Sequence, residues 1–442
     1  MYKRIGITVL LSLFLISVMA QKKWNYVEVD TKSYTLFQQK KWDELIAFSA
    51  ESRKQGIDFF YLQARTGIAF YNLKKYRVAS EWFLRAWEND RSFEWLQEYL
   101  YYSLVFSGRS SEASKYAAKF TKPMQQKIGF VKNKPLRLAV EGGYSFNPNF
   151  DELTNGSLDQ EAEVGDNYGE AYYLKNYHFE SVDFSHRVLP GFNITHNLSF
   201  VTVNREQQID WGRRNTFPVK TQQYQYFINP NFIVGKRIHI SPSFNVVWGK
   251  SELFLGAERG ANRYFYPSEI NYSDFIFSTS VWSNFGNFIT GAEINFASIT
   301  NRNFNQYSAW ITYYPFSNTN FYITPKIYFK SDAGNGFGYN TFGISGGAKL
   351  GPVYFYGQYL VGDMKNFIET AGYVIANFPG RSENKFMGTL YFPIGKKYQF
   401  LVRYINQNIF ETYQVYTGGI PGNSVEYSYY KHTITGGISW NF

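Results

Sequence analysis

The chain has 442 residues, no cysteine, 20% aromatic residues and a formal net charge of +10. Without cysteine, disulfides, thiol catalysis and thiolate metal sites are excluded. Residues 21–134 hold twenty basic and twelve acidic side chains, whereas residues 135–442 hold twenty-three of each. The basic excess therefore lies in the amino-terminal region, where it either attracts anionic headgroups or an acidic polymer, or is a solvated surface.

Residues 1–20 predict a secretory signal peptide. They contain the basic residues Lys3 and Arg4, an apolar stretch over 5–18 and the small-residue site Val18-Met19-Ala20. That stretch is shorter than the roughly 20 residues of a membrane-spanning helix, so cleavage before Gln21 is expected. An exported chain is not expected to bind nucleic acid. Because no later segment has eighteen consecutive apolar residues, we expect strands to cross the membrane.

Residues 21–127 are helical in period and repeat every 34 residues. The central copy, 60–93, resembles a tetratricopeptide repeat at its small and aromatic packing positions. These positions are Gly67, Phe70, Tyr76, Ala79, Phe83 and Ala86. Two to three repeats are expected, and Trp82, Trp87 and Trp95 are interpreted as packing residues.

The resemblance implies a concave groove that binds a partner, the alternative being a packed helical spacer. The groove-facing positions implied by the resemblance are Tyr34, Phe37, Ile68, Tyr71, Asn72, Tyr102 and Phe106.

A linker is expected over 128–135, and from 136 to 442 the hydrophobic period changes to two. The segment Ile238–Trp248 shows the pattern, with apolar residues alternating with His239, Ser241, Ser243 and Asn245. Alternation of this kind, with abundant aromatic residues, favours a transmembrane antiparallel β-barrel. The predicted fold class is therefore α+β and multidomain, with a short helical repeat domain before the barrel.

Fourteen strands are predicted, with twelve or sixteen as alternatives. Short turns such as 234–237 and 394–397 alternate with longer connections, which we expect at 148–170, 211–220, 254–268, 367–382 and 412–426. Short turns on one side and long loops on the other are typical of outer-membrane barrels. The first long loop is acidic, which suits calcium, but it lacks the ordered spacing of a calcium loop.

Alternation also predicts charged residues that face the barrel lumen. These are Glu141, Asp183, Arg187, Glu293, Lys326, Lys330, Arg403 and Lys431. They line a conduit or form ion pairs that plug the barrel, and the pattern does not choose between the two. The five histidines show no metal or triad spacing, so no catalytic residue, cofactor or metal site is expected.

The last strand alternates up to a terminal phenylalanine. Its pattern Thr435-x-Gly437-x-x-Trp440-x-Phe442 resembles the carboxy-terminal signal by which barrels of Gram-negative bacteria are recognised by their insertion machinery. The resemblance implies an outer-membrane location. With the short turns, it predicts that the helical domain lies in the periplasm.

The order of helical repeats and barrel, with Gly142-Gly-Tyr-Ser-Phe146, resembles the YaiO-type outer-membrane barrel family. A second resemblance is to exopolysaccharide export porins, which carry longer repeat arrays. Together they imply a non-enzymatic protein whose repeats bind a periplasmic protein or polymer during export or assembly of surface material such as polysaccharide. The alternative is a scaffold subunit of a larger outer-membrane complex with a plugged barrel.

Overall fold

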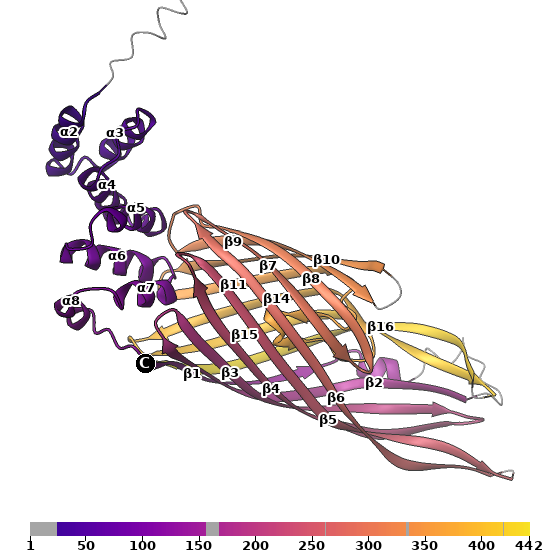
Figure 1. Cartoon of the computed structure of the whole chain (residues 1–442). Helices are drawn as coiled ribbons and strands as arrows, with labels where there is room; N and C mark the ends of the chain where they lie inside the picture. The colour runs from indigo at the N-terminus through magenta and orange to yellow at the C-terminus, as the bar shows by residue number, and fades with distance from the viewer. Residues whose placement is uncertain (1–23, 156–167, 261, 333–335, 419) are drawn as a thin grey trace, which may run out of the picture. The chain divides into compact units, whose positions relative to one another are not determined.

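The computed structural model describes all residues except 1–23, 156–167, 261, 333–335 and 419 (Figure 1). The expected signal peptide and most of the acidic loop lie outside the described residues. The described chain forms two compact units, one of helices and one built around a β-barrel. None of the described helices is long and apolar enough to cross a membrane.

The helical unit contains six of the described helices, and their starts recur at a fixed interval. Helices α2, α4 and α6 begin at Tyr26, Phe60 and Glu94, each 34 residues after the one before. The bounds are α2 Tyr26–Gln38, α3 Trp42–Lys54, α4 Phe60–Asn72, α5 Tyr76–Asn89, α6 Glu94–Phe106 and α8 Lys122–Lys127. The expected period of 34 residues is therefore a property of the fold.

Local sequence explains where these helices begin and how they pack. Asn25 caps α2 by accepting from the Glu28 amide, and the Glu28 side chain accepts from the Asn25 amide. Gly67 is required by close packing, because a Cβ there would lie 2.6 Å from the Phe83 ring. The main core cluster of α2 to α4 consists of Val29, Leu36, Leu45, Phe48, Ile57, Leu62 and Ala69.

The second unit is a closed antiparallel barrel of fourteen strands among the described residues, which confirms the predicted strand count. Each strand pairs with its neighbour along the chain, and β1 pairs with β16 to close the ring, with Val140 opposite Ile438. The bounds are β1 Lys134–Phe146, β2 Tyr168–Leu189, β3 Phe192–Asp210, β4 Arg214–Val234, β5 Ile238–Arg259, β6 Asn262–Phe285, β7 Phe288–Ile299, β8 Arg302–Tyr313, β9 Phe321–Asp332, β10 Gly336–Leu350, β11 Val353–Gly362, β14 Arg381–Ile394, β15 Tyr398–Thr417 and β16 Ile420–Asn441.

Burial in the barrel is inverted relative to a water-soluble protein. On β5 the polar residues His239, Ser241, Ser243 and Asn245 are buried, whereas the alternate Phe244 and Trp248 are exposed. The same alternation places Ile434 and Ile438 of β16 outside and Thr433 and Thr435 inside. Side chains of successive strand residues point to opposite faces, so the sequence period of two produces an apolar exterior and a polar interior.

Three of the expected long loops are mostly strand, and the prediction was wrong there. Residues 214–220 belong to β4, 254–259 and 262–268 to β5 and β6, and 412–417 and 420–426 to β15 and β16. The turn residues in these stretches interrupt the alternation, but cross-strand pairing continues to Arg259 opposite Asn262. The barrel hairpins are therefore longer on this side than the sequence indicated.

One helix that the sequence assigned to the helical region packs with the barrel. Helix α7, Ser110–Ala117, lies within residues 108–119, which cluster with the β-strands, while residues 120–128 belong to the helical unit. The chain thus enters the barrel unit, leaves it and returns before β1.

Candidate functional site: the closed interior of the barrel

The connection between β11 and β14 folds into the barrel instead of extending away from it. It contains the short strands β12, Ile368–Glu369, and β13, Val374–Ile375, separated by the single turn η2, Thr370–Gly372. Gln306 of β8 clasps this segment, because its Nε2 donates to the Ile368 carbonyl at 2.6 Å and its Oε1 accepts from the Ile368 amide at 3.1 Å. The Gln306 side chain therefore binds both backbone groups of Ile368, as a neighbouring strand would.

Strands β4 and β5 hold the turn of this inward segment. Asn245 Nδ2 donates to the Gly372 carbonyl at 2.6 Å, and Gln225 Nε2 donates to the Tyr373 carbonyl at 2.7 Å. The Ser243 hydroxyl donates to the Ala371 carbonyl. Thr370 and Ala371 have positive φ, a conformation that persists only where the surroundings fix it. These hydrogen bonds supply that constraint.

Two lysines of the barrel wall anchor the segment, and one of them, Lys385, also neutralises its carboxylate. Lys385 Nζ lies 2.6 Å from Glu369 Oε1, and both side chains are buried. Lys330 Nζ donates to the Lys365 carbonyl at 2.8 Å. A buried charge is tolerated only when it is paired, so these contacts fix the position of the segment inside the barrel.

Apolar side chains complete the anchoring. Met364 and Phe367 pack with Tyr328 and Leu360 of the wall, and Ile368 packs with Ile276 and Phe304. The sequence predicted a long external connection over 367–382, whereas residues 368–375 form the inward strands and turn. The run Phe367-Ile368, which is too apolar for a solvated loop, was the available signal.

At the short-turn end, α7 is fixed to the barrel by the buried carboxylate of Glu112. Its Oε2 lies 2.5 Å from Arg109 Nη2, and its Oε1 accepts from Asn284 Nδ2 at 2.8 Å. His239 Nε2 lies 3.3 Å from the same oxygen. Burial alone would raise the pKa of Glu112, but the hydrogen bonds from His239 and Arg109 hold that pKa below its ordinary value.

Further contacts join α7 to neighbouring turns of the barrel. Lys115 Nζ donates to the Ile233 and Gly235 carbonyls at 2.7 and 2.6 Å. Asn193 Nδ2 donates to Ser111 Oγ at 2.7 Å, and the Gly191 amide donates to Ser114 Oγ at 3.1 Å. The helix is thus bound to the β2–β3, β4–β5 and β6–β7 ends of the wall.

At the opposite end, strands that are not neighbours in the ring pair with each other. Residues Gln414 to Tyr416 of β15 pair with Tyr168 to Glu170 of β2. Arg205 Nη1 lies 3.1 Å from Glu411 Oε1 beneath this pairing. The short helix α9, Phe150–Thr154, adds Leu153 to the adjacent core, which consists of Leu153, Ala171, Tyr173, Leu174, Ile409, Tyr413, Tyr427 and Tyr429.

The charged residues predicted to face the lumen lie on the less exposed face of their strands. Arg403 Nη1 lies 3.0 Å from Glu141 Oε2, and Arg187 donates to the Val131 carbonyl at 3.2 Å. Glu293 accepts from Ser280 at 2.8 Å. The ammonium of Lys326 lies over the Trp310 and Tyr328 rings, and that of Lys431 lies over the Tyr177 and Phe378 rings. Asp183 is half-buried.

The positions expected to face a groove in the helical unit are largely aromatic and partly exposed. Tyr34 and Phe106 are exposed, Phe37 and Ile68 are half-buried, and Asn72 donates to the Ile68 carbonyl. The Tyr71 ring contacts Tyr76 and Tyr99 at 5.2 and 5.0 Å, and the Tyr102 and Phe106 rings stack at 5.8 Å. Burial raises the pKa of Tyr71 to about 12.

Three residues of the carboxy-terminal pattern, Thr435, Gly437 and Trp440, lie on β16, which closes the ring, and Phe442 directly follows this strand. Trp440 and Phe442 are exposed and stack at 4.6 Å, whereas Thr435 is buried. Gly437 lies opposite Glu141 of β1. The C-terminus lies beside the start of β1, where the Phe442 amide donates to the Leu136 carbonyl at 3.1 Å (Figure 1).

Within the described ranges, no group of three or more His, Asp or Glu side chains has a geometry that could hold a metal ion. Outside the α7 contact, His196 and His432 have hydrogen bonds with Tyr226 and Tyr404 at 3.0 and 2.7 Å.

A closed antiparallel barrel with an even strand number, an apolar exterior and a polar interior satisfies every backbone group without water. These features define an outer-membrane β-barrel protein.

Comparisons with known proteins found distant similarity to solved structures. No protein-family description matches the chain, and no curated protein matches it. A FadL homologue of Pseudomonas aeruginosa is 8% identical, with a TM-score of 0.43 over 74% of this chain and 94% of that one. The Pseudomonas putida toluene transporter TodX is 8% identical, with a TM-score of 0.43 over 71% of this chain and 91% of that one. The translocator domain of autotransporter NalP from Neisseria meningitidis is 9% identical, with a TM-score of 0.29 over 77% of this chain and 99% of that one. Scores this low carry no information on what this barrel does.

Proposed function

We propose that the protein is a non-enzymatic outer-membrane anchor whose barrel is closed by its own chain and whose helical domain binds a partner in the periplasm. The observation that carries the proposal is the inward segment between β11 and β14. Its backbone is hydrogen-bonded to interior side chains of β4, β5 and β8, and its Glu369 is paired with Lys385. A segment held in this way is part of the folded interior.

A conduit for export or assembly of surface material, including polysaccharide, is the competing function. It requires the inward segment to leave the barrel, which would break the buried Lys385–Glu369 pair and expose the clasped backbone of Ile368. Breaking a buried pair by removing one partner costs about 3–5 kcal/mol, so spontaneous opening would be rare without a second component. The closed scaffold needs no such component.

The helical domain supports a binding role through its repeat spacing and its aromatic surface. Helix starts at 34-residue intervals fit the tetratricopeptide resemblance, and the YaiO-type order of domains fits it as well. The proposed partner is a periplasmic protein or polymer, bound across Tyr34, Tyr71, Tyr102 and Phe106. Photo-crosslinking from Tyr102 in the full chain should capture a partner that a Tyr71→Ala variant captures less well.

Location and orientation follow from the proposed carboxy-terminal signal. Thr435, Gly437, Trp440 and Phe442 would be recognised by the insertion machinery, and the apolar exterior would contact outer-membrane lipids. Because the chain has no cysteine, a single cysteine at Ser92 provides a clean probe. It should react with an impermeant maleimide only after the outer membrane is permeabilised, and reaction in intact cells would contradict a periplasmic helical domain.

Planar-bilayer conductance tests whether the barrel is closed. The full chain should give no stable current, whereas a variant with residues 365–377 replaced by a Gly-Ser linker should give discrete current steps. The variant also shows that the barrel inserts under the conditions used. A stable open current from the unaltered protein would refute the closed anchor and support the conduit.

A further inference from the structure

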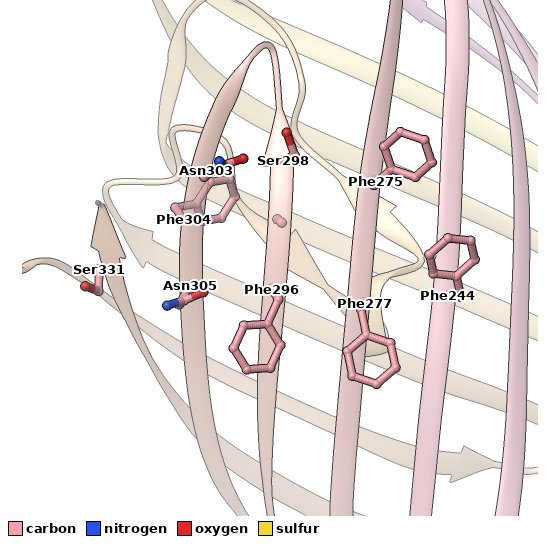
Figure 2. Close-up of a pocket in the computed structure, with 10 residues that line it drawn as sticks. Phe244, Phe275, Phe277, Phe296, Ser298, Asn303, Phe304, Asn305 and Ser331 are labelled. Carbon is pink, nitrogen blue, oxygen red and sulfur yellow. The ribbon is translucent and has the colours of Figure 1, made fainter. Parts of the chain in front are cut away.

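A groove with a volume of about 400 Å³ lies on the outer face of strands β5 to β9 (Figure 2). Its lining has no charged side chain and consists of Phe244, Phe275, Phe277, Phe296, Ala297, Ser298, Asn303, Phe304, Asn305 and Ser331. The four exposed phenyl rings come from β5, β6 and β7, whereas the buried Phe304 belongs to β8, and most of the polar groups come from β8 and β9. The groove is therefore aromatic on one wall and polar on the other.

Strand register explains this arrangement. Phe244 pairs with Phe277, Phe277 with Phe296, Phe296 with Asn305, and Asn305 with Ser331, which forms one row across five strands. A second row, nearer the Thr300–Asn301 turn, contains Phe275, Ser298 and Asn303. Figure 2 shows these side chains beside the β7–β8 hairpin.

The two rows face away from the barrel interior. Their phenylalanines Phe244, Phe275, Phe277 and Phe296 are 42 to 46% exposed, whereas the alternate residues Ile276, Asn295 and Gln306 are buried. The groove is therefore continuous with the apolar exterior that contacts membrane lipid.

Asn303 and Asn305 make this part of the exterior unusual. Among the described residues, neither amide side chain has a hydrogen-bond partner, and Asn305 shares its row with three outward phenyl rings. An amide that faces hydrocarbon without a partner is costly, so the position favours an occupant that presents both an apolar chain and a hydrogen-bonding group.

We propose that this groove binds one membrane lipid, with an acyl chain against the four phenyl rings and its ester or amide carbonyl hydrogen-bonded to Asn305 or Asn303. The occupant is inferred from the continuity of the groove with the lipid-facing surface and from its polar wall. The lack of charge in the lining favours recognition of the acyl linkage over recognition of a phosphate. The site is independent of whether the barrel conducts.

Native mass spectrometry of the delipidated full chain tests the site, with dioleoyl phosphatidylethanolamine as the probe. In the unaltered protein the first lipid should bind at least about tenfold more tightly than later ones. The double variant Phe277→Ala and Phe296→Ala should lose that preference, because it removes two rings from the apolar wall. A control pair, Phe342→Ala and Phe400→Ala, removes exposed phenyl rings elsewhere on the barrel and should retain it. Heat-modifiable gel mobility verifies that each variant is folded.

A second measurement separates the polar contact from non-specific hydrophobic binding of lipid. The unaltered protein should prefer the ester-linked lipid to its ether-linked analogue, and the variant Asn303→Leu and Asn305→Leu should bind both equally. Equal first-lipid affinity in the unaltered protein and the Phe277 and Phe296 variant would overturn the proposal. Equal losses in the groove and control variants would overturn it too, as would failure of the unaltered protein to discriminate ester from ether.

Discussion

Replacing Glu112 by leucine should release α7 from the short-turn end of the barrel. The carboxylate is fully buried, with 0% side-chain exposure, and its partner Arg109 is 2% exposed. Leucine has a similar side-chain volume, but it lacks the carboxylate that accepts hydrogen bonds from Arg109, Asn284 and His239. Removing one partner of a buried pair costs about 3–5 kcal/mol, so the ratio of docked to undocked α7 should fall by about two orders of magnitude or more.

Crosslinking measures this ratio directly, because the chain has no native cysteine. Cysteines at Ser111 and Asn193, whose side chains are hydrogen-bonded at 2.7 Å, should be joined rapidly by a short bis-maleimide. The rate should fall in the Glu112→Leu background, because the docked population of α7 is smaller.

The matched control is Glu98→Gln. Glu98 pairs with Lys127 at 2.7 Å, but Lys127 is exposed and Glu98 only half-buried, and a pair at the surface contributes about 1 kcal/mol or less. The crosslinking rate should therefore not change. An unchanged rate in Glu112→Leu would refute the reasoning that the buried carboxylate holds the helix.

Three further outcomes are expected. Contacts in the docked state hold the pKa of Glu112 below its ordinary value of 4.5, so docking is favoured above that value and lost as pH falls through the depressed pKa. Amide exchange over residues 108–119, corrected for intrinsic rates, should therefore rise as the pH falls through this range. Constant protection down to pH 2 would contradict this. Gln306→Leu removes the side-chain donor and acceptor that bind the Ile368 carbonyl and amide, so hydrogen exchange of the Ile368 amide should increase about tenfold, with no change at Ile438. Equal protection of the Ile368 amide in both proteins would show that these hydrogen bonds are dispensable. Gly67→Ala places a Cβ 2.6 Å from the Phe83 ring and should destabilise the helical unit by about 1–3 kcal/mol. Circular dichroism at 222 nm should show this as a lower melting temperature. Gly436→Ala, which has open space around the added Cβ, should leave the melting temperature unchanged.

Strand number and the inside or outside position of strand residues could be predicted because both depend on local alternation. A period of two in Ile238–Trp248 specifies which side chains face lipid, whatever the rest of the fold does. The 34-residue helical period was similarly visible, since it depends on packing residues such as Gly67 and Phe83 within one repeat.

The contacts of the inward segment and of α7 could not be predicted in the same way because they join residues far apart in the chain. Gln306 and Ile368 are 62 positions apart, and Glu112 and Asn284 are 172 positions apart. Nothing in either local sequence specifies the other partner. The hairpin extensions were missed for a different reason: residues such as Gly256 and Pro267 suggest turns, but cross-strand pairing within the hairpin, with Gly256 opposite Phe265, overrides that preference.

The inward segment and α7 lie at different levels of the barrel, and this has a consequence for conductance. The segment is bonded to mid-strand residues such as Asn245 and Gln306, whereas α7 is bonded to strand ends at Gly191 and Ile233. Where both obstruct the path, their resistances add in series, so removing one leaves the other to limit the current. Glu112→Leu alone should remain silent, the Gly-Ser replacement of 365–377 should give small steps, and the combined variant should conduct more than the sum of the two. Simple additivity would mean that α7 does not obstruct the path and that the inward segment alone closes the barrel.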